Sequence, residues 1–245
     1  MEREYRELSA RFYQESKPVG FSIDGDIEYY RKALQDVSGL VLEAGVGTGR
    51  LLIPLIQSGI RMEGLDSSPE MLKQCRLNLE KHKIEAVLYE QNLMDLSLPK
   101  SYGAIIMPAG TFCILDRDKA QGVLHRFYDH FDVAGRLIID IEMPMDFQEG
   151  TVTTTTVSTP DNQEIRLTSH SEKMDWLAQK VTYINKYELI KAGDVIKTET
   201  SILILNWYGM EEFRMKLSLA GYKDIDYQIA YGKDEAGIVT FVAYK

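Results

Sequence analysis

Short apolar runs alternate with segments of helical periodicity between residues 40 and 142. The runs are rich in aliphatic and β-branched residues, and the segments between them repeat their apolar positions with the period of a helix. This alternation is typical of βαβ units, in which helices cover both faces of a parallel sheet. The runs that we predict as strands are 40–45, 61–66, 85–89, 102–107 and 136–141. Together they predict a doubly wound α/β core.

Helix signals fill the spaces between these strands. We expect one helix over residues 49–58, with Gly59 placed to end it. In residues 67–82 a serine can cap the N-terminus, and Pro69 suits the first turn. Residues 117–130 repeat apolar positions on one helical face and predict a further helix.

The pattern changes to a period of two from about residue 148 to residue 206. This alternation predicts an antiparallel sheet, inserted into the core or appended onto it. Its predicted strands are 151–159, 164–174, 180–190 and 195–205. The turns between them read "PDNQ", "DWLA" and "AGD".

The α/β pattern then resumes. Residues 209–221 predict an amphipathic helix, and the segments 222–232 and 237–245 predict a last pair of strands. We therefore divide the chain into a core domain of residues 1–147 and 207–245 and an inserted β subdomain of residues 148–206.

Composition narrows the classes of function. The chain has 245 residues, is 44% hydrophobic and carries a net charge of −9, so a folded protein that does not bind nucleic acid is expected. Cys75 and Cys113 match neither a disulfide framework nor a metal site, and we predict no metal. The charged N-terminus lacks the apolar core of a signal peptide, and the aliphatic run "LLIPLI" is too short to cross a membrane. We therefore expect a cytoplasmic protein that does not act at a membrane.

Three glycines follow the first predicted strand in "VLEAGVGTGR", residues 41–50. A glycine-rich turn between a strand and a helix lets a ligand touch the backbone near the positive end of the helix. Dinucleotides and S-adenosylmethionine both use such a turn. The dinucleotide fingerprint requires Gly or Ala three positions after its second glycine, where this chain has Arg50. This departure disfavours an NAD(P)-dependent oxidoreductase, which stays open as an alternative.

Two acids lie beside the turn: one suits any adenosine cofactor, and the other favours S-adenosylmethionine. Asp66 ends the second predicted strand, where a carboxylate can accept hydrogen bonds from both ribose hydroxyls of an adenosine cofactor. Glu43 ends the first predicted strand just before the glycines. A carboxylate there attracts the ammonium group of a methionine moiety and repels a diphosphate.

The segment from about residue 26 to residue 142 resembles class I S-adenosylmethionine-dependent methyltransferases, especially small-molecule members of the methyltransferase domain 25 type. The matching motifs are "DIEYY", "VLEAGVGTGR", "GLDSSPEML", "YEQNLMDLSL" and "YGAIIMPAGTF". The tail "YGMEEFRMKLSLAGYKDI" is similar to the last helix of that family. The resemblance implies a Rossmann-like, doubly wound seven-stranded sheet with an antiparallel last strand, and an N-terminal helical lid over about residues 1–36. It does not cover the inserted antiparallel β-sheet or about the first 20 residues.

The resemblance also implies a set of cofactor contacts. The methionine part would lie on the glycine turn, the ribose on Asp66, and the adenosine near the next two loops. Asn92 stands where the family commonly has Asp to accept from the adenine amine, and its carbonyl oxygen can do the same. The implied cofactor-binding residues are Glu43, Ala44, Gly45, Gly47, Asp66, Ser67, Met71, Asn92, Leu93 and Pro108.

The substrate side is less specified. We expect Tyr13 of the lid, Thr111 and Phe112 after the fourth strand, and Glu142 after the fifth strand to face the substrate. The sulfonium methyl is already activated, so an in-line displacement needs mainly alignment and exclusion of water. For this reason the sequence identifies no catalytic residue.

The sequence therefore predicts methyl transfer from S-adenosylmethionine to an unidentified small molecule. The alternative of another class is a non-catalytic protein that binds S-adenosylmethionine and holds a partner. The inserted sheet is expected either to roof the substrate pocket or to form a homodimer surface.

Overall fold

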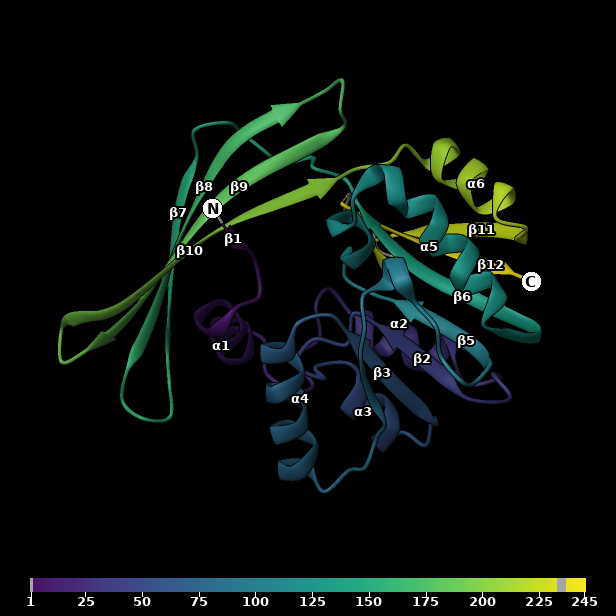
Figure 1. Ribbon diagram of the computed structural model, residues 1–245, viewed down its shortest axis with the longest axis horizontal. Helices are drawn as coiled ribbons and strands as arrows, with labels where there is room; N and C mark the ends of the chain where they lie inside the picture. Colours follow the sequence, from purple (N-terminus) through teal and green to yellow (C-terminus); the bar gives the residue numbers. More distant parts are fainter. Residues whose placement is uncertain (1, 233–236) are drawn as a thin grey trace.

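The computed structural model describes residues 2–232 and 237–245 (Figure 1). Met1, in the predicted lid, and residues 233–236, in the predicted core domain, lie outside the described residues. The helices are α1 (Glu7–Ser16), α2 (Asp26–Ala33), α3 (Leu52–Gln57), α4 (Pro69–His82), α5 (Arg117–Asp129) and α6 (Met210–Leu219). Within the described ranges, every helix is too short or too polar to span a bilayer.

The strands form two sheets (Figure 1). The first contains β2 (Val41–Ala44), β3 (Met62–Asp66), β4 (Leu88–Glu90), β5 (Tyr102–Met107), β6 (Phe131–Glu142), β11 (Lys223–Ile229) and β12 (Ile238–Tyr244). The second contains β1 (Glu2–Arg3), β7 (Val152–Ser158), β8 (Glu164–Asp175), β9 (Lys180–Lys191) and β10 (Asp194–Asn206).

The seven-stranded sheet has the order β11-β12-β6-β5-β2-β3-β4. Strands β2 to β6 pair in parallel, and β12 is antiparallel to both β6 and β11. The predicted Rossmann-like fold with an antiparallel last strand is confirmed.

Alternation along β5 shows how the sheet separates two apolar layers. Ile105 and Met107 pack with the buried faces of α5 and α6. Ala104 and Ile106 join the opposite layer, which includes residues of α2, α3 and α4. Successive side chains of a strand point to opposite faces, so a strand buried on both sides must be apolar throughout.

The five-stranded sheet has the order β1-β10-β9-β8-β7 and confirms the predicted inserted antiparallel strands. Strand β1 was not predicted. It pairs in parallel with β10, with Glu2 opposite Ser201 and Arg3 opposite Ile202. Two residues carry no period, so no pattern could indicate this strand.

Helix α1 lies between the five-stranded sheet and α4 (Figure 1). Leu8 and Phe12 are buried against Ile165, Tyr187 and Leu189 of that sheet. The N-terminal segment therefore joins the two parts of the molecule, although the sequence assigned it to the core domain.

Several predicted boundaries differ from the structure; the predicted strand 85–89, for example, is Leu88–Glu90. Helix α3 begins at Leu52 rather than at residue 49, because Gly49 has a φ of +79° and belongs to the turn. Strand β6 begins at Phe131 rather than at residue 136, since Phe131 already pairs with Tyr102 of β5.

Candidate cofactor site

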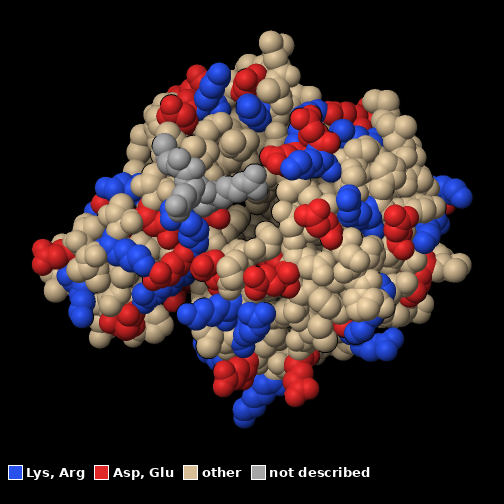
Figure 2. Space-filling model, viewed as in Figure 1, with Lys and Arg blue, Asp and Glu red and all other residues tan. Residues whose placement is uncertain are grey.

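A crevice is expected where the strand order reverses. Strand β2 lies between β3 and β5, so the chain leaves β2 and β5 toward opposite sides of the sheet. The carboxyl ends of these strands face α1 and the five-stranded sheet (Figure 1). Figure 2 shows the surface hollowed between the two parts of the molecule.

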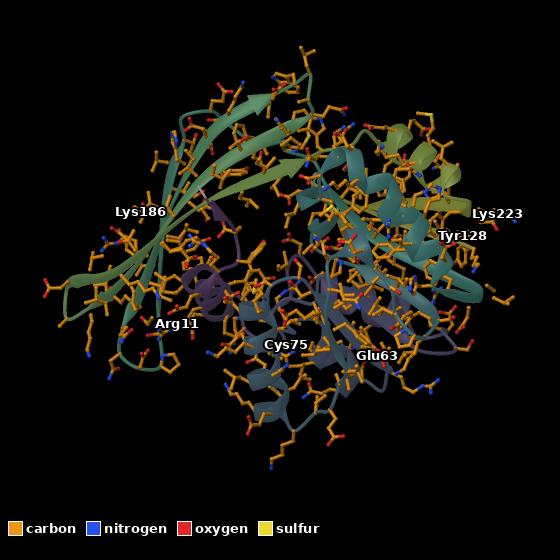
Figure 3. The ribbon with its side chains drawn as sticks, in the orientation of Figure 1. Arg11, Glu63, Cys75, Tyr128, Lys186 and Lys223 are labelled. Atoms are coloured by element: carbon orange, nitrogen blue, oxygen red, sulfur yellow. The ribbon has the colours of Figure 1, made fainter. Side chains whose placement is uncertain are left out.

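The three glycines of the turn have two different roles. A Cβ on Gly45 would lie 2.5 Å from the Thr111 methyl group, and one on Gly49 would lie 2.9 Å from Sγ of Cys75 on α4 (Figure 3). A Cβ on Gly47 would meet nothing within 4 Å, so only the backbone φ of +54° at this position favours glycine. Gly45 and Gly49 thus serve packing, while Gly47 borders open space that a ligand can fill.

Glu43 lies on β2 immediately before this turn. Its side chain is buried, and its Oε2 has no hydrogen-bond partner in the part of the chain that the structure describes. Burial raises the pKa of this carboxyl to about 8, although the charge of Arg50 opposes the shift. A buried carboxylate oxygen without a partner is costly, so a positively charged group beside Glu43 would be favoured.

Asp66 is fixed at the end of β3 by the backbone around it. Its Oδ2 accepts from the Gly47 N–H at 2.9 Å, and its Oδ1 accepts from the Ser68 N–H at 2.9 Å. Burial raises the pKa of Asp66, although these backbone N–H donors oppose the shift. Each carboxylate oxygen has a second acceptor position, so both can still receive a hydroxyl proton.

Arg50, which departs from the dinucleotide fingerprint, holds the turn to the N-terminal segment. Its guanidinium donates to Oδ2 of Asp26 at 2.5 Å and to the Phe21 carbonyl at 2.7 Å. Arg50 and Asp26 are both buried. This buried ion pair joins the glycine turn to the start of α2.

We predict that Arg50→Met destabilises the protein by about 3–5 kcal/mol, because Asp26 would remain as a buried charge without its cation. Urea denaturation of the empty protein measures this change. Arg11→Met is the matched control: Arg11 pairs with Asp161 at the surface (Figure 3), where an ion pair contributes about 1 kcal/mol or less. Equal losses in the two variants would contradict the prediction.

Asp140 of β6 fixes the loop that follows β5 through hydrogen bonds. The Asp140 carboxylate is fully buried and accepts from the Ala109 N–H at 2.8 Å, the Tyr231 hydroxyl at 2.7 Å and the Thr240 hydroxyl at 2.7 Å. Burial raises the pKa of Asp140 to about 6, although these donors oppose the shift. Ala109 has a φ of +54°, so this carboxylate stabilises a conformation that alanine rarely adopts.

The residues expected after β5 are in different environments. Pro108 is buried, and its carbonyl accepts from the Thr111 hydroxyl at 2.8 Å. The methyl group of Thr111 covers Gly45. Phe112 was expected to face the substrate, but its ring is fully buried and packs 5.2 Å from the ring of Phe213. The 3-10 turn that follows Gly110 directs this side chain into the core, so we correct this expectation.

The residues expected near the adenosine flank Asp66. Ser67 is exposed and Met71 is buried at the start of α4, where the Met71 N–H donates to the capping hydroxyl of Ser68. Asn92 is exposed, and its Oδ1 accepts from the Met94 N–H at 2.9 Å. The amide oxygen thus caps a short 3-10 turn whose first residue, Leu93, is buried.

Side chains of the N-terminal segment lie on the other side of the expected crevice from the glycine turn. The ring of Tyr13 meets the ring of Tyr5 edge-on, with centroids 6.4 Å apart. Lys17 Nζ lies 5.1 Å from the centroid of the Tyr13 ring. Burial raises the pKa of Tyr13 and lowers the pKa of Lys17. Tyr5 was missed, because no motif or period surrounds it.

Glu142 ends β6 beside the loop after β5. A Cβ on Gly110 would lie 2.9 Å from Oε2 of Glu142, so the carboxylate packs over this loop. Glu142 is exposed at the end of the strand, but partial desolvation of its carboxyl raises its pKa, although the charge of Lys17 opposes the shift. A small cavity beside Glu142 is lined by Pro144 of the core and by Val181, Tyr183, Leu205 and Trp207.

The sequence comparisons give a domain-level match. Residues 41–135 match the family model described as a methyltransferase domain. A protein of Geobacillus sp. (strain WCH70), provisionally named a methyltransferase, is 25% identical over 106 residues, which are 41% of this chain and 41% of that protein. The chain thus matches about two fifths of the length of this curated relative.

Solved structures match along nearly the whole chain. The sugar N-methyltransferase KedS8 from Streptoalloteichus sp. ATCC 53650 has a TM-score of 0.79 at 17% identity, covering 100% of this chain and 95% of that chain. CalS10, an amino pentose methyltransferase from Micromonospora echinaspora solved with bound S-adenosylmethionine, has a TM-score of 0.72 at 18% identity, covering 100% and 99%. At these identities the likeness shows the fold.

Proposed function

We propose, from the premise that this chain belongs to the class I S-adenosylmethionine-dependent methyltransferases, that it transfers the methyl group of S-adenosylmethionine to an amine nitrogen of a small molecule. The observation that carries the proposal is the buried Glu43 carboxylate, whose Oε2 lacks a partner among the described residues. It lies before a turn whose central glycine borders open space. A cofactor that carries positive charge, rather than a diphosphate, suits this place.

The residues present fit S-adenosylmethionine. Glu43 would attract its positive charge, Asp66 would accept its ribose hydroxyls, and Gly47 would leave room for its methionine part. When bound, the cofactor supplies an activated methyl group. The chain then has to align an acceptor and exclude water, which is worth about 7–11 kcal/mol in favourable cases.

Glu142 supports an amine as the acceptor. An amine is a nucleophile only after its ammonium form loses a proton, and a carboxyl with a raised pKa is a suitable base near neutral pH. The cavity next to Glu142 presents Tyr183 and Trp207, aromatic side chains that favour a cation beside them. The two structural neighbours described above act on a sugar and on an amino pentose, and we propose a small amine of this kind.

The experiment is a screen of small amines, phenols and thiols with S-adenosylmethionine, in which S-adenosylhomocysteine formation is measured. Turnover with amines supports the proposal. Turnover with phenols or thiols alone would exclude the amine. A protein that binds NADH or NADPH but does not bind S-adenosylmethionine would favour the oxidoreductase. A protein that binds S-adenosylmethionine but shows no turnover would favour the non-catalytic alternative.

We predict that Glu142→Gln lowers kcat roughly 100-fold with the best amine, since general base catalysis contributes about this much. A base acts in its ionised form, so the wild-type rate rises with pH through the pKa of Glu142, and the variant loses this rise. Asp146→Asn, an exposed residue of the following loop, is the control and should keep the wild-type profile. An unchanged kcat in Glu142→Gln would show that Glu142 is not the general base.

We also propose that the acceptor is a free metabolite and that the protein acts in the cytoplasm. A homodimer through the inserted sheet stays a prediction, as does the division into residues 1–147 with 207–245 and residues 148–206.

A further inference from the structure

One carboxylate of the N-terminal segment, that of Glu4, is bound by side chains of the five-stranded sheet. Oε2 of Glu4 accepts from the Asn185 amide at 2.7 Å and from the Ser201 hydroxyl at 2.8 Å, and Oε1 accepts from the Tyr187 hydroxyl at 2.5 Å. These three donors are buried, and they come from β9 and β10. Methyl transfer as proposed above does not use them.

A carboxylate of the five-stranded sheet in turn binds the N-terminal segment. Glu199 of β10 accepts from the Leu8 N–H at 2.9 Å, the Ser9 N–H at 3.1 Å and the Ser9 hydroxyl at 2.8 Å. These backbone donors lie in the first turn of α1, where a helix leaves its N–H groups unpaired and favours negative charge. The residues before and at the start of α1 are therefore fixed from both sides.

Tyr5 lies between these two anchors and turns toward the cofactor site. Its φ of +66° is unusual for a tyrosine, and its carbonyl accepts from the Ser68 hydroxyl at 2.8 Å. Ser68 also donates its N–H to Asp66, the expected ribose ligand. The ring of Tyr5 also meets the ring of Tyr13 edge-on, with centroids 6.4 Å apart, and Tyr13 is among the residues expected at the crevice.

We infer that Tyr5 contacts the bound cofactor beside Asp66 and that Glu4, held by Asn185, Tyr187 and Ser201, is the residue that positions it. The inference rests on the proposed function. Glu4 and Tyr5 are consecutive, so fixing one side chain in the sheet orients the next one in the crevice. The inserted sheet then acts on the cofactor site through the N-terminal segment and needs no contact with the cofactor itself.

The test measures the affinity for S-adenosylhomocysteine by calorimetry in the full chain. Glu4→Gln and Tyr5→Ala should each weaken binding roughly ten-fold. The double variant Glu4→Gln with Tyr5→Ala should bind no more weakly than Tyr5→Ala alone, because Glu4 acts through Tyr5. Hydrogen exchange over residues 4–17 should be slowed by the ligand in the wild type and less so in Glu4→Gln.

Glu7→Gln is the matched control. Glu7 belongs to the same segment, and its carboxylate pairs with Lys197 of β10 at 2.6 Å, but it is exposed. This variant should keep the wild-type affinity. If Glu4→Gln does not fold, Tyr187→Phe and Ser201→Ala each remove one donor and are combined with Tyr5→Ala in the same way.

The outcomes separate the two proposals. A wild-type protein that does not bind S-adenosylhomocysteine would overturn the proposed function. A wild type that binds it, with unchanged affinity in Glu4→Gln, would overturn only the inference. Additive losses in the double variant would also overturn it, since they would mean that Glu4 does not act through Tyr5.

Discussion

Asp66→Ala is expected to weaken the affinity for S-adenosylmethionine at least roughly 100-fold. Hydrogen bonds to a charged group contribute about 1.5–3 kcal/mol each, and two ribose hydroxyls would be lost together. The change also removes the acceptor of the Gly47 and Ser68 N–H groups, so the glycine turn would lose its support. Calorimetric titration with S-adenosylmethionine measures the effect.

Asp66→Asn separates these two contributions, because its amide keeps one acceptor oxygen. It should fall between the wild type and Asp66→Ala. Asp36→Ala, which removes an exposed partner of Arg136, is the control and should leave the affinity unchanged. Full affinity in Asp66→Ala would show that the cofactor does not lie across β3 as we propose.

Glu43→Gln is expected to change stability and affinity in opposite directions. Burial raises the pKa of Glu43 from 4.5 to about 8. Between these two values the folded protein holds more protons than the unfolded chain, so the stability of the empty protein falls as the pH rises from 4.5 to 8. Glutamine carries no proton to lose, so the variant should be more stable than the wild type at pH 8 and should lose this pH dependence.

The same substitution removes the charge that we expect to attract the cofactor. Affinity for S-adenosylmethionine should fall roughly ten-fold or more above pH 8, where the wild-type carboxylate is mostly ionised. Thermal unfolding with and without S-adenosylmethionine across this pH range measures both effects. A variant that is both less stable and equal in affinity would refute the assignment.

Glu63→Gln provides the contrast. Glu63 is also a buried carboxylate, but it accepts from the Tyr89 and Tyr102 hydroxyls and pairs with Lys100. Removing its charge should lower stability and leave cofactor affinity unchanged. Glu43 and Glu63 lie on neighbouring strands, and the comparison separates a carboxylate proposed to bind a ligand from one whose partners are all within the protein.

The core of the fold could be predicted because its signals are local. The change of period from 3.6 to 2 near residue 148 marks a real change of architecture, since each period reports which faces of an element are buried. The glycine turn was also readable, because strand, glycines and acid are close in the chain. Gly47 alone borders open space, however, and only the packing of Thr111 and Cys75 separates its role from those of Gly45 and Gly49.

Residues that depend on distant partners could not be predicted. Glu4 is bound by residues almost 200 positions away and Tyr5 by Ser68, and nothing in "MEREYRE" indicates that arrangement. Phe112 was misread for the opposite reason: its neighbours in sequence lie at the crevice, but a short 3-10 turn reverses its direction. Sequence proximity to a motif does not determine which way a side chain points.

The parallel pairing of β1 with β10 has a consequence for synthesis of the chain. The residues of β1 cannot be placed until residues near Ser201 have been synthesised, because their partners lie there. The α/β units between can form earlier from contacts that are closer in sequence. The parallel strands β2 to β6 are therefore expected to assemble before β1 pairs with β10, and the pairing of β1 is among the later steps of folding.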